Sequence, residues 1–327
     1  FGRLAIALAD RFDNPVVRSR TYFTFADNIN HWQAPLVLNI DYYRRAHQAG
    51  IEGGELSFAT YAAQRLVMTQ LAVGRNLDDV QAEAEGLAPF IKRSFPRFQD
   101  KYLDPGILET LAALRGEDEQ REILPFVEND DQLRSGMFYS NEIRRLYWLG
   151  LYREAAHYLE KIDFITDILQ GFVLVAEAHF FMSLALTAIY NQASPTEQAT
   201  YDDCLDKFQA RMRIWAGGCP DNFLHKYLLV EAERAAIAGK VVEAMSLYKQ
   251  AISSAGEFGF IQNEALGNEL YAKFWLELDE MGNAQFYMTR ACGLYSQWGA
   301  SAKISNLERQ YPQLSAAFDT TTDETAH

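Results

Sequence analysis

The residues that could carry catalysis are the histidines and the paired carboxylates, but their spacing does not bring them together. Glu231 and Glu233 flank Ala232, and on a helix this places their carboxylates on neighbouring faces that do not converge. General acid–base chemistry needs two converging groups with separated pKa values. The six histidines form neither a His-Glu-x-x-His motif nor a cluster with cysteine: His31, His47, His157, His179, His225 and His327. We therefore expect this chain not to be an enzyme by itself.

Motifs for nucleotide, cofactor and metal binding are also absent from the sequence. It contains neither G-x-x-x-x-G-K-[ST] nor G-x-G-x-x-G, and it lacks the His-Arg-Asp and Asp-Phe-Gly motifs of kinases. The pair Gly239-Lys240 is expected in a turn between helices, where it cannot cradle a phosphate. Cys204, Cys219 and Cys292 lack metal-binding spacing and fit a reducing cytosol. We expect no cofactor, no metal and a cytoplasmic location.

Two polar stretches in apolar surroundings each allow two interpretations. His179 lies in the most apolar segment, 172–190, as either a ligand or a hydrogen-bonded core histidine, and we favour the core. Asn30, His31 and Trp32 stand just before a helix break. These three residues either line a ligand groove or serve structure, with Trp32 anchoring the core and the other two tying down the turn. We favour the structural role here as well.

Three further aromatic residues are candidates for a binding surface on the inner face of paired helices. They are Tyr139, Trp148 and Trp275. Large aromatic side chains are also common in protein cores, and we favour a core position for the two tryptophans. Together with Asn30, His31 and Trp32, these residues form our candidate binding surface.

Composition indicates an all-helical fold. The 327 residues are 49% hydrophobic and 13% aromatic, which allows a large or extended core. Alternation of Val, Ile and Thr is scarce, so strands are not expected. The net charge of −14 disfavours nucleic acid and anionic membrane surfaces as partners. We also see no apolar run of membrane-spanning length and no signal peptide.

Turn and cap signals divide the chain into helices. Ser194 followed by Pro195 predicts a helix start, whereas Gly299 predicts a left-handed helix end. A single helix is expected over 152–162, and a break at Gly217–Pro220 is expected to precede a helix capped by Asp221. Residues 117–131 are expected to form a loop with one short helical turn. Because the chain begins with Phe1 in mid-helix, we interpret it as a fragment of a longer protein.

A register of small or apolar residues links three expected helical hairpins. In the segment 228–251, two helices join at Gly239, and steps of twelve and seven residues separate the shared positions. The same steps recur in two other hairpins, and the full set is Ile143, Ala155 and Ile162; Ala232, Ala244 and Ala251; Ala272, Ala284 and Ala291. Such hairpins bury their apolar faces by stacking on neighbours. We predict a TPR-like α-solenoid, a right-handed superhelix of antiparallel pairs, as one elongated domain over 1–315, with a disordered linker at 316–327.

Several stretches resemble one specific family. They are Leu224-His-Lys-Tyr-Leu-Leu-Val-Glu-Ala-Glu-Arg-Ala235, Asn263-Glu-Ala-Leu266 with Glu269 and Tyr271-Ala-Lys-Phe274, Tyr295-Ser-Gln-Trp-Gly-Ala-Ser-Ala-Lys-Ile-Ser-Asn-Leu-Glu-Arg-Gln-Tyr-Pro312, Asn30-His-Trp32 with Pro35, and Gly53-Gly-Glu-Leu-Ser-Phe-Ala-Thr-Tyr-Ala62. They resemble the TPR-like helical region of large signalling proteins. Those proteins combine a serine/threonine kinase-like domain, an AAA-type or STAND-type ATPase, this region, a GAF domain and a sensor histidine kinase. The segment 96–131 departs from this resemblance.

The resemblance implies a regulatory sensor and protein-interaction domain without catalytic residues. Its implied partners are the neighbouring ATPase and kinase domains of the same polypeptide and a protein, peptide or small-molecule effector. An alternative is a small-molecule receptor with a pocket enclosed by helices, which a deep pocket of over about 300 Å³ would favour. An open groove would instead favour docking of a peptide or domain. A convergent cluster of titratable residues in a cleft would favour an unrecognised enzyme.

Overall fold

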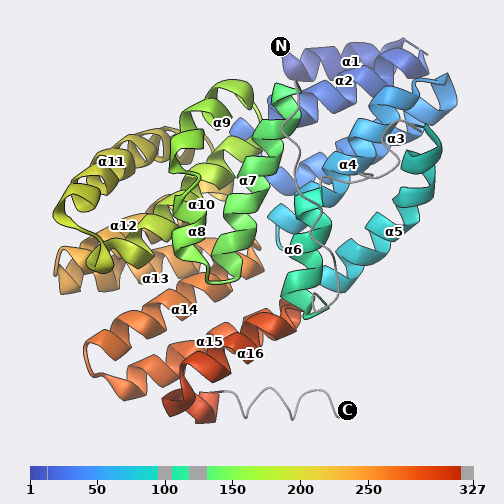
Figure 1. Cartoon of the computed structure of the whole chain (residues 1–327). Helices are drawn as coiled ribbons and strands as arrows, with labels where there is room; N and C mark the ends of the chain where they lie inside the picture. Colours follow the sequence, from blue (N-terminus) through green and yellow to red (C-terminus); the bar gives the residue numbers. More distant parts are fainter. Residues whose placement is uncertain (13, 95–104, 118–130, 318–327) are drawn as a thin grey trace.

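The computed structural model describes residues 1–12, 14–94, 105–117 and 131–317, and within these ranges the chain is helical without strands (Figure 1). The α-helices are α1 (Gly2–Arg11), α2 (Pro15–Asn28), α3 (Asn39–Gly53), α4 (Leu56–Ala72), α5 (Leu77–Ser94), α6 (Pro105–Arg115), α7 (Gln132–Trp148), α8 (Tyr152–Ala156), α9 (Ile162–Ile168), α10 (Val173–Ile189), α11 (Pro195–Gly218), α12 (Pro220–Ile237), α13 (Val241–Glu257), α14 (Ile261–Glu277), α15 (Met281–Trp298) and α16 (Ser301–Gln310). Short 3-10 helices also occur: η1 (Asn30–Trp32), η2 (Leu36–Leu38), η5 (Leu159–Lys161), η6 (Tyr190–Gln192) and η7 (Pro312–Ala317). The prediction of an all-α protein is confirmed.

Local cap signals are confirmed where a side chain or a glycine acts on its own neighbours. Ser194 accepts a hydrogen bond from the backbone of Glu197, and Glu197 bonds back, so that α11 begins with a complete capping box. Gly299 ends α15 with φ at 91°. Gly239 turns between α12 and α13 with φ at 69°, as expected of a hairpin corner.

Other predicted boundaries are wrong. The helix expected over 152–162 is split into α8, η5 and the start of α9. The break expected at Gly217–Pro220 is present at Cys219, between the end of α11 at Gly218 and the start of α12 at Pro220, but Cys219 and not Asp221 is the N-cap. Most of the expected loop at 117–131 lies outside the described residues. Of the expected linker at 316–327, the first two residues belong to η7 and the rest lie outside the described residues.

The repeating register corresponds to buried helix contacts. All nine positions are at most 2% exposed, including Ala244 and Ala284 at 0%. Helix α12 packs against α13, and α14 packs against both α13 and α15. Small side chains let these helix backbones approach closely, and larger neighbours such as Tyr248 and Met288 fill the surrounding space. The helices α12 to α15 therefore pack as hairpins, and the register positions of the split third hairpin are buried as well.

Helix α10 is buried against α7, α8, α11 and α12. The segment Val173–Gln192 is long and apolar enough by composition to cross a membrane, which corrects the expectation that no apolar run reaches that length. However, 83% of the 18-residue window that defines it is buried inside the fold. Core helices are hydrophobic all round for the same reason as membrane spans, and α10 serves here as a core helix.

The apolar interior consists of two clusters. A smaller one includes Tyr22, Phe25 and Leu36 from the first helices, whereas a larger one extends from α4 to the segment after α16. Polar side chains lie where the first helices meet α10 and α12, and we call this set the polar junction: Asp27, His31, Arg65, Glu177, Asn222 and Lys226. Lys226 lies between the two apolar clusters. Its ammonium is 5.9 Å from the centroid of the Phe180 ring in the larger cluster and 5.4 Å from that of the Phe260 ring in the smaller one.

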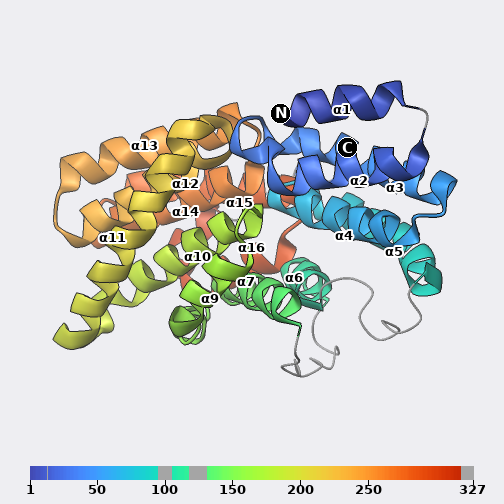
Figure 2. The same cartoon turned by 90° about the horizontal axis from the view of Figure 1, so that it is seen from above.

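The last helices return to the early part of the chain, and we call this contact the clasp. Helix α16 packs against α6, as both views show (Figures 1 and 2). The Ser301 hydroxyl donates to the Arg115 carbonyl at 3.0 Å, and the Asn76 amide donates to the Gln297 carbonyl at 2.9 Å. An open, elongated array would keep such distant segments apart. The clasp instead brings them into contact, which differs from the elongated shape that we expected.

Candidate functional site

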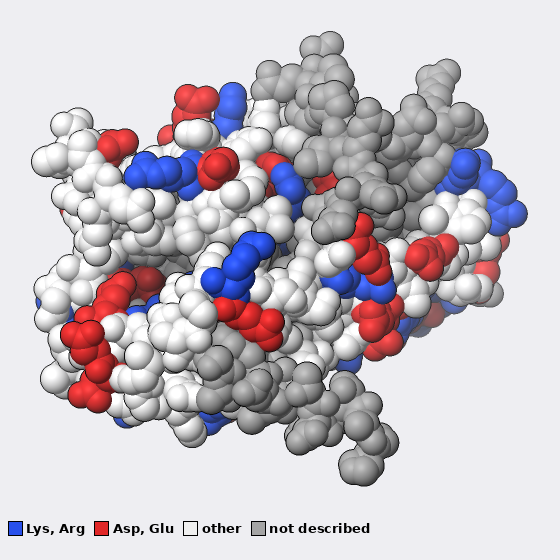
Figure 3. Space-filling view, turned by 60° about the horizontal axis from the view of Figure 1, so that its bottom comes forward, with Lys and Arg blue, Asp and Glu red and all other residues white. Residues whose placement is uncertain are grey.

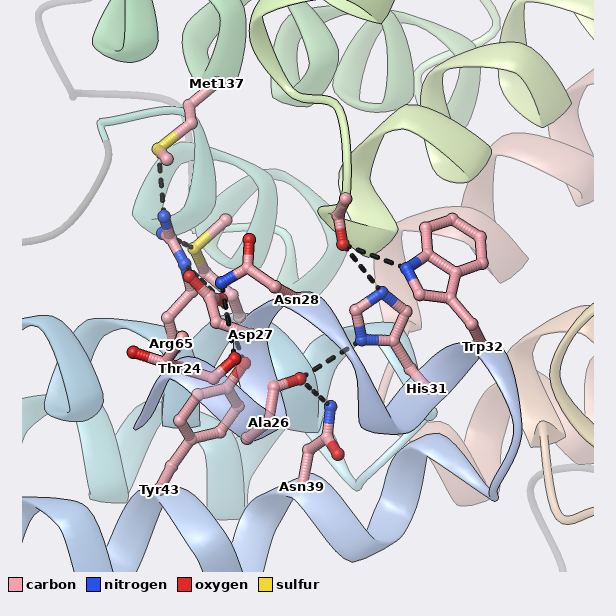
Figure 4. Close-up of polar contacts among 12 residues, drawn as sticks. Thr24, Ala26, Asp27, Asn28, His31, Trp32, Asn39, Tyr43, Arg65 and Met137 are labelled. Carbon is pink, nitrogen blue, oxygen red and sulfur yellow. Dashed lines mark hydrogen bonds and ion pairs between the residues drawn. The ribbon is translucent and has the colours of Figure 1, made fainter. Parts of the chain in front are cut away.

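Asn30, His31 and Trp32 lie in the turn between α2 and α3, and they are held by hydrogen bonds within the fold. His31 Nδ1 lies 3.1 Å from the Ala26 carbonyl, and its Nε2 lies 3.1 Å from the Gly171 carbonyl (Figure 4). Trp32 Nε1 donates to the same Gly171 carbonyl at 3.1 Å, so both rings converge on one acceptor. Asn30 donates to the Asn39 amide oxygen at 2.7 Å. These contacts support the structural interpretation of all three residues.

Asn222, in the first turn of α12, fixes the same turn from the other side. Its amide nitrogen donates to the carbonyls of His31 and Ala34 at 2.7 and 2.9 Å, and its amide oxygen accepts from the Leu36 backbone at 2.7 Å. The side chain is 1% exposed. Sequence analysis missed Asn222, because its partners lie more than 180 residues earlier in the chain.

A second part of the junction is an ion pair between α2 and α4. Arg65 Nε donates to Asp27 Oδ1 at 2.9 Å, and Tyr43 donates its hydroxyl to the same oxygen at 3.0 Å (Figure 4). Arg65 also contacts the sulfur of Met137 on α7 at 3.4 Å. Burial raises the pKa of Asp27, although Arg65 and Tyr43 oppose that effect. The ion pair connects α2, α4 and α7, and both of its side chains are already bonded to other groups of the protein.

The other three predicted residues lie at separate places. Tyr139 is 6% exposed among Tyr158 and Phe164. Trp148 is 4% exposed beside Trp298, with ring centroids 5.3 Å apart. Trp275 is half-buried next to Tyr271 and packs against the larger core. The structure therefore does not bring the six predicted residues together on one surface.

His179 is a hydrogen-bonded core histidine, as we favoured. Its Nε2 lies 3.0 Å from the Thr166 hydroxyl, and its ring stacks on Phe208 with centroids 4.9 Å apart. Burial lowers the pKa of His179 to about 3, so the ring is neutral near pH 7. Burial likewise lowers the pKa of His31 to about 4.

A cluster of titratable side chains that sequence analysis did not single out surrounds Glu269 on α14. Its carboxylate accepts from Lys273 at 2.6 Å, from Lys303 at 3.1 Å and from the Tyr295 hydroxyl at 2.6 Å. Burial alone would raise the pKa of Glu269, but the two lysines lower it to about 2. On α12, burial raises the pKa of Glu233 to about 7, although the Tyr248 hydroxyl bonded to it opposes that rise.

These two carboxyl groups have separated pKa values, as acid–base pairs in enzymes do. However, Glu269 is 1% exposed and already surrounded by its lysines and Tyr295. Buried ion-pair networks in protein interiors perturb pKa values in the same way. The cluster therefore joins α14, α15 and α16, and it leaves no room for a substrate beside Glu269.

A groove open to solvent lies between α13, α14 and α15. It has a volume of about 360 Å³ and is lined by Lys249, Ile252, Ser253, Gly256, Glu257, Glu264, Tyr287 and Arg290. Sequence analysis did not name these residues. One signal was present: Glu264 stands eight residues before Ala272, which on a helix places a carboxylate on the packed stripe.

Two small hollows in the described part of the chain are lined mainly by buried side chains. One, of about 10 Å³, is bordered by Arg144, Glu177 and Trp298, and the other, of about 20 Å³, by Asp27, Arg65 and Glu177. Each is large enough for about one water molecule. Within the described ranges, no group of three or more His, Cys, Asp or Glu side chains could hold a metal ion, and all three cysteines are free.

Comparison with known proteins gives one partial similarity. No protein-family model matches the chain. A segment of 62 residues, 19% of the chain, is 34% identical to part of a protein named hybrid signal transduction histidine kinase G of Dictyostelium discoideum. The match spans 2% of that protein. This similarity suggests a signal-transduction context for the chain.

Proposed function

We propose that this chain is a TPR-like α-solenoid within a multidomain signalling protein and that it acts by regulatory binding, not by catalysis. The buried register of α12 to α15 supports a stack of helical hairpins. The partial similarity to a hybrid histidine kinase supports the signalling context. Its partners would be neighbouring kinase and ATPase domains, such as the AAA-type or STAND-type ATPases of the family it resembles, and a protein effector. We place it in the cytoplasm, as its free cysteines allow.

The observation that supports this proposal most strongly is the contrast in volume between the open groove and the small interior hollows. The groove offers about 360 Å³ on the surface, whereas the interior hollows offer about 10 and 20 Å³. Pockets for small molecules surround most of the ligand and typically exceed about 300 Å³. An open groove between helices is instead typical of peptide and domain docking.

The charge distribution is consistent with docking of a protein. Acidic and basic side chains are interspersed on the face shown in Figure 3, without an extended basic patch there. A regulatory role requires that the array contact its partner differently in two states, since only a differential interaction shifts an equilibrium. Docking on the rigid outer helices would transmit such a difference to a neighbouring domain.

A small-molecule receptor is the second candidate, because the volume of the groove falls within the range of ligand pockets. Native mass spectrometry of the purified chain distinguishes the two. We expect the mass of the polypeptide alone, and a stoichiometric small molecule that remains bound would favour the receptor.

Two measurements test the proposal itself. The purified chain should not hydrolyse ATP, and turnover above that of a heat-denatured sample would contradict a non-catalytic role. Cross-linking capture from a cell extract should enrich proteins with kinase or ATPase domains relative to a helical protein of equal size and charge. Equal recovery of such proteins by both baits would also contradict it.

A further inference from the structure

The groove contains a carboxylate that the protein itself does not satisfy. The Glu264 side chain, on α14, is 20% exposed. Its closest cation is Arg290 on α15, with Nη2 3.7 Å from Glu264 Oε1, and Arg290 itself is 50% exposed. Within the described part of the chain, the carboxylate oxygens of Glu264 accept no hydrogen bond at standard distances. Burial raises the pKa of Glu264, and Arg290 opposes this only in part.

Glu269, five residues further along the same helix, is a carboxylate whose charge is fully balanced by hydrogen bonds and ion pairs within the protein. It accepts three hydrogen bonds, from Lys273, Lys303 and Tyr295. The Glu264 side chain, in contrast, reaches the solvent of the groove and has only its long ion pair with Arg290. The contrast within one helix shows that Glu264, unlike Glu269, can accept a further partner from the groove.

The absence of a side chain at Gly256 allows this arrangement. Gly256 lies in the last turn of α13, on the wall of the groove. A Cβ atom there would lie 3.0 Å from Glu264 Oε2 and 3.1 Å from its Cδ, closer than ordinary van der Waals contact. The glycine therefore leaves the carboxylate accessible from the groove.

We propose that this groove binds a partner protein through a lysine or arginine side chain whose cationic group bonds to Glu264. The stem of that side chain would lie along Tyr287 and Ile252, which line the groove with Glu264. This inference rests on the proposed function, because it names the chemistry of the docked partner. A charge-assisted hydrogen bond to a mostly buried carboxylate is the strong kind, and it would complete the environment of Glu264.

The charges at the rim of the groove favour particular residues next to that basic residue in the partner's sequence. Lys249 and Arg290 are cationic groups at the edge, and Glu257 is the anionic one. A run of basic residues would meet repulsion from the two cations. A single basic side chain flanked by acidic residues fits both the floor and the rim, so the expected partner segment has mixed charge.

The experiment uses the whole chain and two fluorescein-labelled pentapeptides, followed by fluorescence anisotropy. In the probe, a central arginine is separated from an aspartate on each side by one alanine, and in the reference peptide glutamine replaces arginine. The wild-type chain should bind the arginine peptide at least about tenfold more tightly, as loss of a charge-assisted hydrogen bond implies. Equal binding of the two peptides would overturn the proposal.

Two variants and one matched control locate the effect. Glu264→Gln should abolish the preference for arginine. Gly256→Ala keeps every charge and favours the helix, yet it should weaken arginine binding about fivefold by crowding the carboxylate. Glu280→Gln makes the same change of charge at an exposed site outside the groove and should alter binding less than twofold. An equal loss in Glu264→Gln and Glu280→Gln would mean general attraction to an acidic chain and would contradict the proposal.

Two further measurements distinguish a protein side chain from a free small-molecule cation, and failure of the groove proposal from failure of the proposed function. Free arginine amide that competes as effectively as the peptide would indicate a small-molecule site and would overturn the protein-docking assignment. Capture of kinase or ATPase proteins that survives in Glu264→Gln would leave the proposed function intact and remove only this groove. Loss of capture in that variant, but not in Glu280→Gln, would support both.

Discussion

The polar junction and the hairpins α12 to α15 are both buried, but they are held together in different ways. At the junction, side chains bond to backbone atoms or to opposite charges far away in sequence, as Asn222 does with the turn that contains His31. In the hairpins, small residues such as Ala244 and Ala272 allow backbones to pack at a repeated spacing. A repeated register of small residues packs neighbouring helices closely, and bonds such as that from Tyr295 to Glu269 add to it. The contact between unlike parts of the chain relies mainly on directional bonds.

Loss of one charge at the junction should have the largest effect. Glu177→Gln leaves Lys226, which is 1% exposed, without its ionic partner. Removal of one member of a buried pair costs about 3–5 kcal/mol, and urea unfolding followed by circular dichroism measures this. Glu160→Gln, at an exposed carboxylate beside Lys161, should change stability by less than about 0.5 kcal/mol. Similar values for both variants would contradict the importance of the junction.

Acid should remove the contribution of His31 to stability before it removes that of Glu269. The pKa of His31 is about 4 in the folded chain and 6.5 in the reference state, so the unfolded chain binds a proton that the folded chain excludes. Stability from His31 is therefore present above pH 6.5 and is lost as the pH falls towards 4, by up to about 3 kcal/mol. For Glu269, with a pKa of about 2 against 4.5, the loss occurs only between about pH 4.5 and 2.

The pH dependence of urea unfolding in two variants checks this order. His31→Gln should flatten the decline in stability between pH 6.5 and 4, because it removes the titrating ring. Glu269→Gln should leave that decline unchanged. An unchanged slope in His31→Gln would show that other groups, such as His179 or His225, dominate the acid response.

The hairpins should be most sensitive to added volume, and this effect is the smallest of the three. Ala272→Leu inserts a larger side chain where the residue is 0% exposed, and overpacking of this kind costs about 2 kcal/mol. Ala210→Leu, at an exposed position of α11, should change the unfolding free energy by less than about 0.5 kcal/mol. A neutral Ala272→Leu variant would mean that the register does not require small residues.

Local and periodic features of the fold could be predicted from the sequence. Ser194 and Gly299 act on residues within a few positions of themselves, and the nine register positions repeat at fixed steps. The N-cap of the helix near 220 was misplaced at Asp221. Pro220 occupies the first helical position, which its fixed φ favours, so Cys219 becomes the N-cap.

The candidate site was less predictable. Asn222, His31 and Trp32 bond to residues about 140 to 190 positions away in the sequence. No local sequence pattern encodes such a contact. Glu264 carried one signal, its place on the packed stripe eight residues before Ala272. The approach of Gly256 to its carboxylate depends on how α13 meets α14, which only the packed structure reveals.

The clasp has a consequence for the order in which the chain folds. In an open stack of hairpins each unit touches only its neighbours, so either end can fray alone. Here Gln297 and Ser301 bond to residues 221 and 186 positions earlier, and closing such long loops costs entropy that only the finished contact returns. We expect the hairpins to form early and the clasp to close last. In the folded chain, detachment of α16 would then expose the surface of α6 that it covers.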